Sequence, residues 1–388
     1  MINTFCRFLK WIAPASIDRT RLPTIFLASC LLLSTGCSTA HSEILQPHEI
    51  TIPGQADWVD CGRVFSAGTE GEWDLYLWGG FGTTVIKKDG IFYLYYQGAN
   101  GYDDNEGTVT YRAIGVATST DGTNFTKHAG NPVLTWFPND HLEEGAVSGG
   151  AFLQENGDIA IYYGANNWIG GSLVNADGRL ATSPDGFNFT DQAIVLDHSN
   201  SAIWGSGDEL FPVIGFQDNG RWFTYYIPNG VLQQGRLGTA WGDSQIDLPN
   251  SAPARSGVNS ISAWGAASQV RLGDDVYALF VNNIRDAGGP TLTVYTVSLQ
   301  NPASLSAPIH TYQFDNMIQG IVYRDEETET WFMFYRHSDL QSYGVKVASA
   351  DGRLITCPNT AHQTMLPLIR QEIASQSPIS CSNDSNVR

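Results

Sequence analysis

Carboxyl side chains that stand just before apolar runs are the groups in this sequence best suited to chemistry. Asp74 and Glu144 each lie six residues before the glycine that precedes such a run, and Glu209 directly precedes another. Cleavage of a glycosidic bond needs one carboxyl group that donates a proton and a second that activates water or attacks carbon. A third acid nearby raises the pKa of the proton donor by like-charge repulsion. These three acids can do this only if the fold brings them together.

Neighbouring acids leave two of the three positions open. Asp140 and Glu143 compete with Glu144, and Asp208 competes with Glu209. For Asp208 and Glu209 the alternative is a loop pair that caps backbone amides. Because the chain has 39 acidic residues, position within the fold rather than residue type must select the candidates.

An internal repeat supplies the elements that would position these acids. A β-branched and aromatic run recurs five times, and its shared aromatic positions are 67, 63, 54 and 55 residues apart. Each copy begins with Asn-Gly, Asp-Gly or an equivalent polar pair, which predicts a tight hairpin. An apolar run precedes each copy, and a further strand with a polar turn follows most of them. The shared aromatic residues are Tyr96, Tyr163, Tyr226, Phe280 and Tyr335.

Each repeat unit predicts a four-stranded antiparallel blade. One blade cannot cover both of its faces, so the copies must pack radially. A β-sandwich, the alternative, does not predict repeated aromatic strands in the same register. The sequence therefore predicts an all-β fold, a five-bladed β-propeller over residues 57–356. The expected blades span about 57–134, 140–200, 205–250, 262–305 and 310–352.

The N-terminus has the pattern of an export signal over residues 1–37. Arg19 and Arg21 precede a short apolar stretch. This stretch ends in Ser34-Thr35-Gly36-Cys37, which resembles a bacterial lipobox and predicts lipidation of Cys37. We expect an exported protein of the outer membrane, periplasm or cell surface. A linker over residues 38–56 would follow the signal segment. An ordinary secretory signal cut near Ala40 is the alternative.

The cysteines predict a disulfide bond, and the net charge limits the classes of molecule that the protein is expected to bind. In an oxidising compartment we expect a disulfide between Cys357 and Cys381, which closes a short loop in the tail 357–388, and the partner of Cys61 stays open. A net charge of −18 disfavours nucleic acid and anionic lipid, so a membrane would be reached only through the lipid anchor. We expect a monomer with a carbohydrate substrate and no cofactor, although a structural Ca²⁺ on the axis remains open.

The motifs of the first unit resemble a known superfamily. They are Glu72–Gly80, Lys88–Gly90, Tyr95–Gly98, Ala117–Phe125 and Gly130–Leu134. Their combination is similar to that of the five-bladed glycosidase propellers, which include glycoside hydrolase families 43, 32, 68, 117 and 130. The resemblance covers most of the chain after the linker and does not select one family.

The resemblance implies roles for the three acids in an axial funnel. Asp74 would be the base or nucleophile, Glu144 the acid that tunes a pKa or holds substrate, and Glu209 the general acid. The last two units lack an equivalent acid except Asp315. The expected function is therefore cleavage of glycosidic bonds in a poly- or oligosaccharide, and the alternative is a non-catalytic carbohydrate-binding propeller. A lyase would need a Tyr, His or Lys base in the funnel.

Five further residues are predicted to contact substrate. Trp78 and Trp168 are placed where aromatic rings could stack on sugar faces, with filling between blades as the alternative. Asp208 accompanies Glu209. Arg336 and His337 directly follow the fifth aromatic strand, at the predicted rim, where they could hold a sugar hydroxyl or carboxylate or form a surface salt bridge.

Overall fold

The computed structural model describes residues 50–77, 83–101, 112–136, 145–169, 172–207, 209–229, 235–349 and 357. Within these residues, every regular element is a β-strand except the short 3-10 helix η1 (Gln55–Asp57). None of their helical segments is long and apolar enough to cross a membrane. The described part of the chain confirms the all-β prediction.

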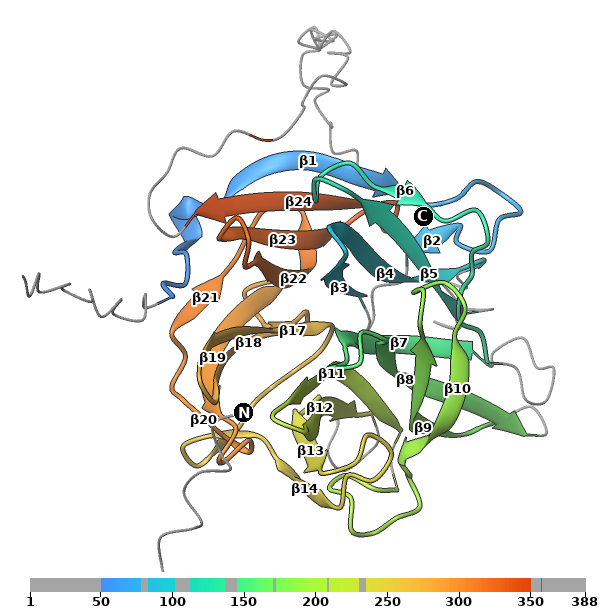
Figure 1. The fold of residues 1–388 in the computed structure, drawn as a ribbon, viewed down its shortest axis with the longest axis vertical. Coiled ribbons are helices and arrows are strands. Elements are labelled where there is room, and N and C mark those ends of the chain that lie inside the picture. Colours follow the sequence, from blue (N-terminus) through green and yellow to red (C-terminus); the bar gives the residue numbers. More distant parts are fainter. Residues whose placement is uncertain are drawn as a thin grey trace, which may run out of the picture. The chain divides into compact units, whose positions relative to one another are not determined.

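The strands form four hydrogen-bonded sheets, and the largest contains two antiparallel meanders joined by one parallel bridge between Arg112 and Gly145. We call the resulting five meanders blades 1 to 5 (Figure 1). Blade 1 contains β3 (Thr83–Lys88), β4 (Ile91–Ala99), β5 (Arg112–Ser119) and β6 (Thr126–Lys127), and β2 (Tyr76–Leu77) adds to β4. Blade 2 contains β7 (Gly145–Leu153), β8 (Ile159–Ile169), β9 (Ser172–Ser183) and β10 (Thr190–Leu196). Blade 3 contains β11 (Leu210–Asp218), β12 (Arg221–Pro228), β13 (Gly238–Gly242) and β14 (Asn250–Pro253).

Blade 4 is the most elaborate of the five. It contains β17 (Ala267–Gly273), β18 (Val276–Asn283), β19 (Thr291–Ser298), β20 (Ser304–Leu305) and β21 (His310–Tyr312). The hairpin of β15 (Arg255–Ser256) and β16 (Asn259–Ser260) attaches to it, because β15 pairs with β20.

Blade 5 joins the two ends of the described chain. It contains β22 (Met317–Asp325), β23 (Thr330–His337), β24 (Ser342–Ser349) and, as its outermost strand, β1 (Val59–Ser66) (Figure 1). The sequence assigned this N-terminal segment to the first blade, so that boundary is wrong. The repeat could not reveal it, because the outer strand of blade 5 comes from the far end of the chain.

The same strand pairing explains the disulfide. Cys61 in β1 is bonded to Cys357, which follows β24 at a sequence separation of 296 residues. The predicted Cys357–Cys381 bond is therefore wrong. Pairing of β1 with β24 brings the two ends of the described chain together, and a preference for short loops could not anticipate this.

The tight turns and the aromatic core follow the sequence pattern. Asp89-Gly90 and Asn219-Gly220 both adopt positive φ, with φ of 52° and 76° in the first pair and 51° and 72° in the second. These angles suit a two-residue hairpin whose twist matches the strands. The five repeated aromatic side chains are all at most 2% exposed and belong to the hydrophobic core clusters: Tyr96, Tyr163, Tyr226, Phe280 and Tyr335.

The innermost strands β3, β7, β11, β17 and β22 surround a central channel (Figure 1). Its cavity of about 250 Å³ is lined by residues of all five strands. Polar groups join neighbouring strands across it. Gln269 Nε2 donates to the carbonyl oxygen of Gly215 at 3.2 Å, and the Val322 backbone N–H donates to Ser268 Oγ at 2.8 Å.

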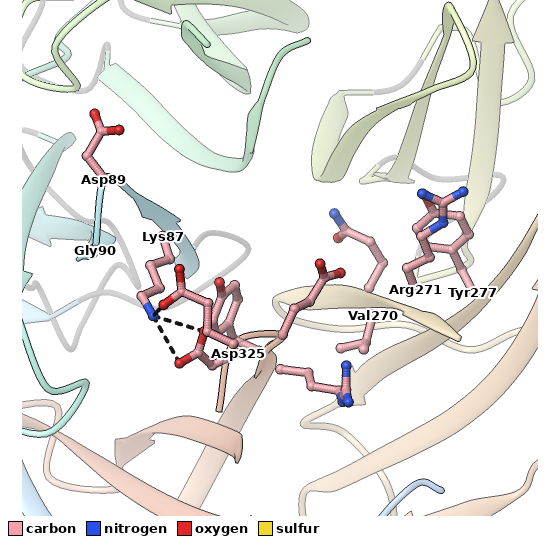
Figure 2. Close-up of a pocket in the computed structure, with 12 residues that line it drawn as sticks. Lys87, Asp89, Gly90, Val270, Arg271, Tyr277 and Asp325 are labelled. Atoms are coloured by element: carbon pink, nitrogen blue, oxygen red, sulfur yellow. Dashed lines mark hydrogen bonds and ion pairs between the residues drawn. The ribbon is translucent and has the colours of Figure 1, made fainter. Parts of the chain in front are cut away.

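The inner strands run in the same direction along this channel. Lys87, Arg271 and Asp325, from the C-terminal ends of β3, β17 and β22, line one cavity of about 350 Å³ (Figure 2). We call this end of the channel the C-terminal mouth. The inner strands begin at the opposite end, which we call the N-terminal mouth.

Candidate functional site

Amide and guanidinium side chains mark the N-terminal mouth in every blade. They come from the ends of the second strands, each opposite the start of an inner strand: Gly145 pairs with Asn166, for example, and Gln319 pairs with Arg336. The positions are Gln97, Asn166, Asn229, Asn283 and Arg336. Three of the five stand three residues after the repeated aromatic residue, a signal in the sequence that the search for acids missed.

Several of these groups are buried without a partner. Gln97 is fully buried, and among the described residues neither its amide nitrogen nor its amide oxygen has a hydrogen-bond partner. Asn166 is 2% exposed and its Oδ1 is likewise unpaired. A buried amide without a partner costs on the order of 1–3 kcal/mol, so such groups need an explanation. One explanation is that these amides form hydrogen bonds with a bound ligand.

Arg336 is buried in the blade interface, so the prediction that it stands at the rim is wrong. It lies within β23, is 5% exposed and donates from Nη1 to the carbonyl oxygen of Leu77 at 3.2 Å, while its Nε is unpaired. Burial lowers the pKa of this guanidinium from its ordinary value, although the side chain stays charged. Arg336 therefore places a buried positive charge between blades, close to the start of β22.

His337 ends the same strand and is partly buried. Burial lowers the pKa of its imidazole, and Nε2 is buried without a hydrogen-bond partner. Its ring packs near that of Tyr335, with 4.9 Å between ring centroids. A neutral imidazole can accept or donate one hydrogen bond. The charged groups that act on this one, Asp60, Arg63, Asp339 and Lys346, belong to the outer part of blade 5.

Glu209 is the predicted catalytic residue that the structure places at the N-terminal mouth. It directly precedes β11 and is partly exposed. Its Oε2 accepts a hydrogen bond from Asn229 Nδ2 at 2.7 Å, and its carbonyl oxygen accepts one from the Asn229 N–H at 2.8 Å. These bonds orient the carboxyl group while leaving it accessible from solvent, which a general acid requires.

Asp74 lies elsewhere, in an interior ion pair. It is 3% exposed, its Oδ2 is 2.6 Å from Lys127 Nζ, and it accepts a hydrogen bond from the Tyr96 hydroxyl at 3.0 Å. Lys127 belongs to β6, the outermost strand of blade 1. These are the contacts of a structural residue, and they do not fit a base that must reach substrate.

Two tryptophans explain why Asp74 and Glu209 are not equivalent. Trp73 packs on Tyr96 in blade 1, with ring centroids 5.8 Å apart, and Trp204 packs on Tyr226 in blade 3 at 6.4 Å. Asp74 directly follows the first tryptophan, whereas Glu209 comes five residues after the second. Asp74 packs beside Gly98 of β4 and bonds Lys127 of β6, whereas Glu209 bonds Asn229 after β12. The two acids therefore have different surroundings, although both precede an inner strand.

The structure does not describe the side chains of the remaining predicted site residues. Glu144, Trp78, Asp208, Cys37 and Cys381 lie outside the described residues, as do the competing acids Asp140 and Glu143. Trp168 has its backbone in β8, and its side chain lies outside the description.

Metal ligands are sparse in the described part of the chain. One group there, Asp177, Asp197 and His198, has donor atoms within 4.8 Å of one another. Asp177 Oδ1 already accepts from the His198 backbone N–H at 3.0 Å and contacts His198 Nδ1 at 2.7 Å. These bonds account for the cluster without an ion. The described lining of the central cavity includes no carboxylate.

The comparisons with known proteins concern the fold. No family model matches the chain, and no curated protein matches it. One similar solved structure comes from work on glycoside hydrolases within the family 130 of mannoside phosphorylases, which target β-1,2 mannosidic linkages in Candida mannan. It has 14% identity and a TM-score of 0.52, and the match covers 80% of this chain and 99% of that one. An α-L-arabinofuranosidase from Podospora anserina in complex with cellotriose has 13% identity and a TM-score of 0.50, covering 75% and 96%.

A third solved structure has a similar fold. The catalytic domain of a family 62 α-L-arabinofuranosidase from Coprinopsis cinerea has 11% identity and a TM-score of 0.50, covering 76% of this chain and 98% of that one. The chain thus has the fold of the propeller glycosidases, as the motifs of its first unit implied, and its family within them is not assigned.

Proposed function

We propose that the chain is a glycosidase-like enzyme whose reaction takes place at the N-terminal mouth. The observation that carries the proposal is Glu209, an oriented and accessible carboxyl group in a mouth whose wall holds unpaired amides. Solved structures with the same fold include glycoside hydrolases and mannoside phosphorylases, which supports a carbohydrate as substrate.

Glu209 acts in this proposal as the general acid that protonates the leaving oxygen. The second carboxyl group would come from Glu144 or its neighbours Asp140 and Glu143, or from Asp208. It would activate water for hydrolysis, attack the anomeric carbon, or assist transfer to phosphate in a phosphorylase. Asp74 has a structural role here, as the partner of Lys127.

A non-catalytic carbohydrate-binding protein is the alternative. Confinement of Asp74 in an interior ion pair favours it, since this acid was the predicted base. In that case the unpaired amides of the mouth would hold a sugar that is bound and not cleaved.

Release of reducing sugar and of sugar phosphate from a panel of glycans, with and without inorganic phosphate, tests the proposal. We expect Glu209→Gln to lower turnover by about 10²–10⁴-fold, the usual contribution of a general acid. Asp74→Asn should lower thermal stability and leave turnover per folded molecule nearly unchanged. Asp243→Asn is the matched control, because this acid is 93% exposed. Full activity of Glu209→Gln would refute its role, and glycan binding without turnover would favour the alternative.

We further propose that the chain is exported and anchored through Cys37. The Cys61–Cys357 disulfide supports export, since such bonds persist in oxidising compartments. A mature mass that starts at Cys37 and includes a lipid would support this, and a mass that starts near Ala40 would contradict the anchor.

A further inference from the structure

A second cavity, of about 390 Å³, opens at the N-terminal end of blades 3 and 4. Its position follows from strand pairing: Arg236, just before β13, pairs with Ser262, and Trp264, just before β17, pairs with Asn283 at the end of β18. We call it the Trp264 pocket. Its size is within the range of small-molecule sites. Its lining residues are Gly235, Arg236, Val258, Asn259, Ser260, Ser262 and Trp264.

The backbone around the Trp264 pocket is held in place. The Ala263 N–H donates to the Gly235 carbonyl oxygen at 2.9 Å. Gly235 has φ of +70°, and a Cβ there would lie 1.9 Å from Trp264 Nε1, so only glycine lets the indole approach this closely. The Arg285 guanidinium lies 3.5 Å from the centroid of the Trp264 ring. These contacts fix the indole before any ligand arrives.

Charge at the Trp264 pocket is opposite to that of the whole chain. The chain carries −18, yet none of the seven lining residues is acidic. Arg236 lines the pocket, and two further arginines flank its lining residues: Arg285 stacks on Trp264, and Arg255 pairs across the β15–β16 hairpin with Ser260. All three side chains are exposed. Among the described residues, no ion pair involves any of these three arginines. The nearby Asp286 instead contacts Asn283 and Thr291.

We propose that the Trp264 pocket binds a sugar residue that carries a carboxylate or a sulfate group. Arg236 supplies a charge-assisted hydrogen bond to the anion, and Trp264 supplies apolar surface for the sugar ring. Asn259, Ser260 and Ser262 offer neutral donors and acceptors for hydroxyl groups. The choice of a glycan rests on the proposed function, whereas the negative charge of the ligand follows from the three arginines.

Titration calorimetry on the full chain tests the proposal with three oligosaccharides of equal length. They are a galacturonate oligomer with carboxylates, a sulfated galactan oligomer and a neutral mannan oligomer. We expect one or both anionic oligomers to bind, more weakly as NaCl is raised. Arg236→Gln should weaken that binding at least about 10-fold and change binding of the neutral oligomer less than 2-fold. Binding of the galacturonate oligomer would identify carboxylate as the anion, and binding of the sulfated oligomer would identify sulfate.

Arg63→Gln is the matched control, because its side chain is 61% exposed and lies in blade 5. Arg236→Lys should restore part of the affinity, which a purely structural role would not predict. Failure of both anionic oligomers to bind at low salt would overturn the proposal. Equal losses for anionic and neutral oligomers in Arg236→Gln would also overturn it. Binding is read without turnover, so a failed glycosidase assay is distinguishable from a failure of this site.

Discussion

The central channel has two mouths, and their charged and amide groups are paired in different ways. At the C-terminal mouth Lys87 contacts Asp325 at 3.0 Å and Glu327 at 2.8 Å, and Figure 2 shows its ammonium directed at Asp325. Arg271 likewise has an acidic partner, Asp218 at 3.5 Å. At the N-terminal mouth the described residues give Arg336 no carboxylate partner. The Gln97 amide there has no hydrogen-bond partner in the part of the chain that the structure describes.

The difference separates groups that hold the blades together from groups that are available to a ligand. Lys87 belongs to β3 in blade 1 and Asp325 to β22 in blade 5, so their ion pair joins two blades. At the C-terminal mouth Asp218 Oδ2 has no hydrogen-bond partner among the described residues, but Oδ1 of the same side chain is paired with Arg271. A buried amide with no partner lowers stability, and its retention is understandable where substrate completes its hydrogen bonds.

Removal of Lys87 should have the largest effect on stability. In Lys87→Met, Asp325 would keep a buried charge, since its side chain is 4% exposed and that of Lys87 13%. Breaking such a pair typically costs about 3–5 kcal/mol. Urea unfolding should show this loss, and glycan turnover per folded molecule should not change. A loss of turnover comparable with that of Glu209→Gln would contradict the assignment of the two mouths.

Arg63→Met is the control for this variant. Its pair with Asp339, at 3.2 Å, is 61% and 40% exposed, so its removal should cost less than about 1 kcal/mol. An equal loss of stability in the two variants would contradict the expectation that the buried Lys87–Asp325 pair stabilises the protein more than the exposed Arg63–Asp339 pair.

Gln97→Leu should have a smaller effect and the opposite sign. It replaces a fully buried, unpaired amide by an apolar group of similar size, so the free energy of unfolding should rise by about 1–2 kcal/mol. If the amide serves substrate, glycan affinity should fall in the same variant. Urea unfolding and calorimetry measure the two effects.

Gln154→Leu is the matched control at the other mouth. Gln154 is 9% exposed and follows β7, and its Nε2 donates to Gln245 Oε1 at 2.8 Å. Its loss should destabilise the protein by about 1 kcal/mol, because a bond is removed. Destabilisation in both variants would mean that the Gln97 amide is satisfied within the fold.

Local signals in the sequence predicted the strands well. Asp89-Gly90 and Asn219-Gly220 specify their hairpins through residues that tolerate positive φ, a property of the chain segment itself. The outer strand β1 of blade 5 and the Cys61–Cys357 bond depend on contacts across nearly the whole chain. No short-range pattern contains that information.

The site was predicted in part, because residue spacing does not give the partners of a side chain. Glu209 was expected just before an inner strand and directly precedes β11. Asp74 was expected to act as a base, and in the structure it pairs with Lys127. Gln97 was not anticipated, because nothing in the sequence marks an amide as unpaired.

His337 gives the smallest expected effect, a change in pH dependence at the N-terminal mouth. Burial lowers the pKa of its imidazole below the value near 6.5 that it has in the unfolded chain. Between the two pKa values the unfolded state binds more protons, so the free energy of unfolding should rise with pH in that window. Below the folded pKa the penalty is present in full, and above about pH 6.5 it is absent.

His337→Gln should therefore flatten the dependence of the urea midpoint on pH between about 5 and 7, the range in which histidine titrates. The comparison variant is His310→Gln, which removes a histidine from β21 in blade 4. The two variants should differ most at the acidic end, where wild type carries the penalty and His337→Gln does not. A steeper profile in His337→Gln would mean that the charged imidazole is stabilised at this mouth. A glycan that hydrogen-bonds the neutral ring should in turn bind more tightly as the pH rises through the same window.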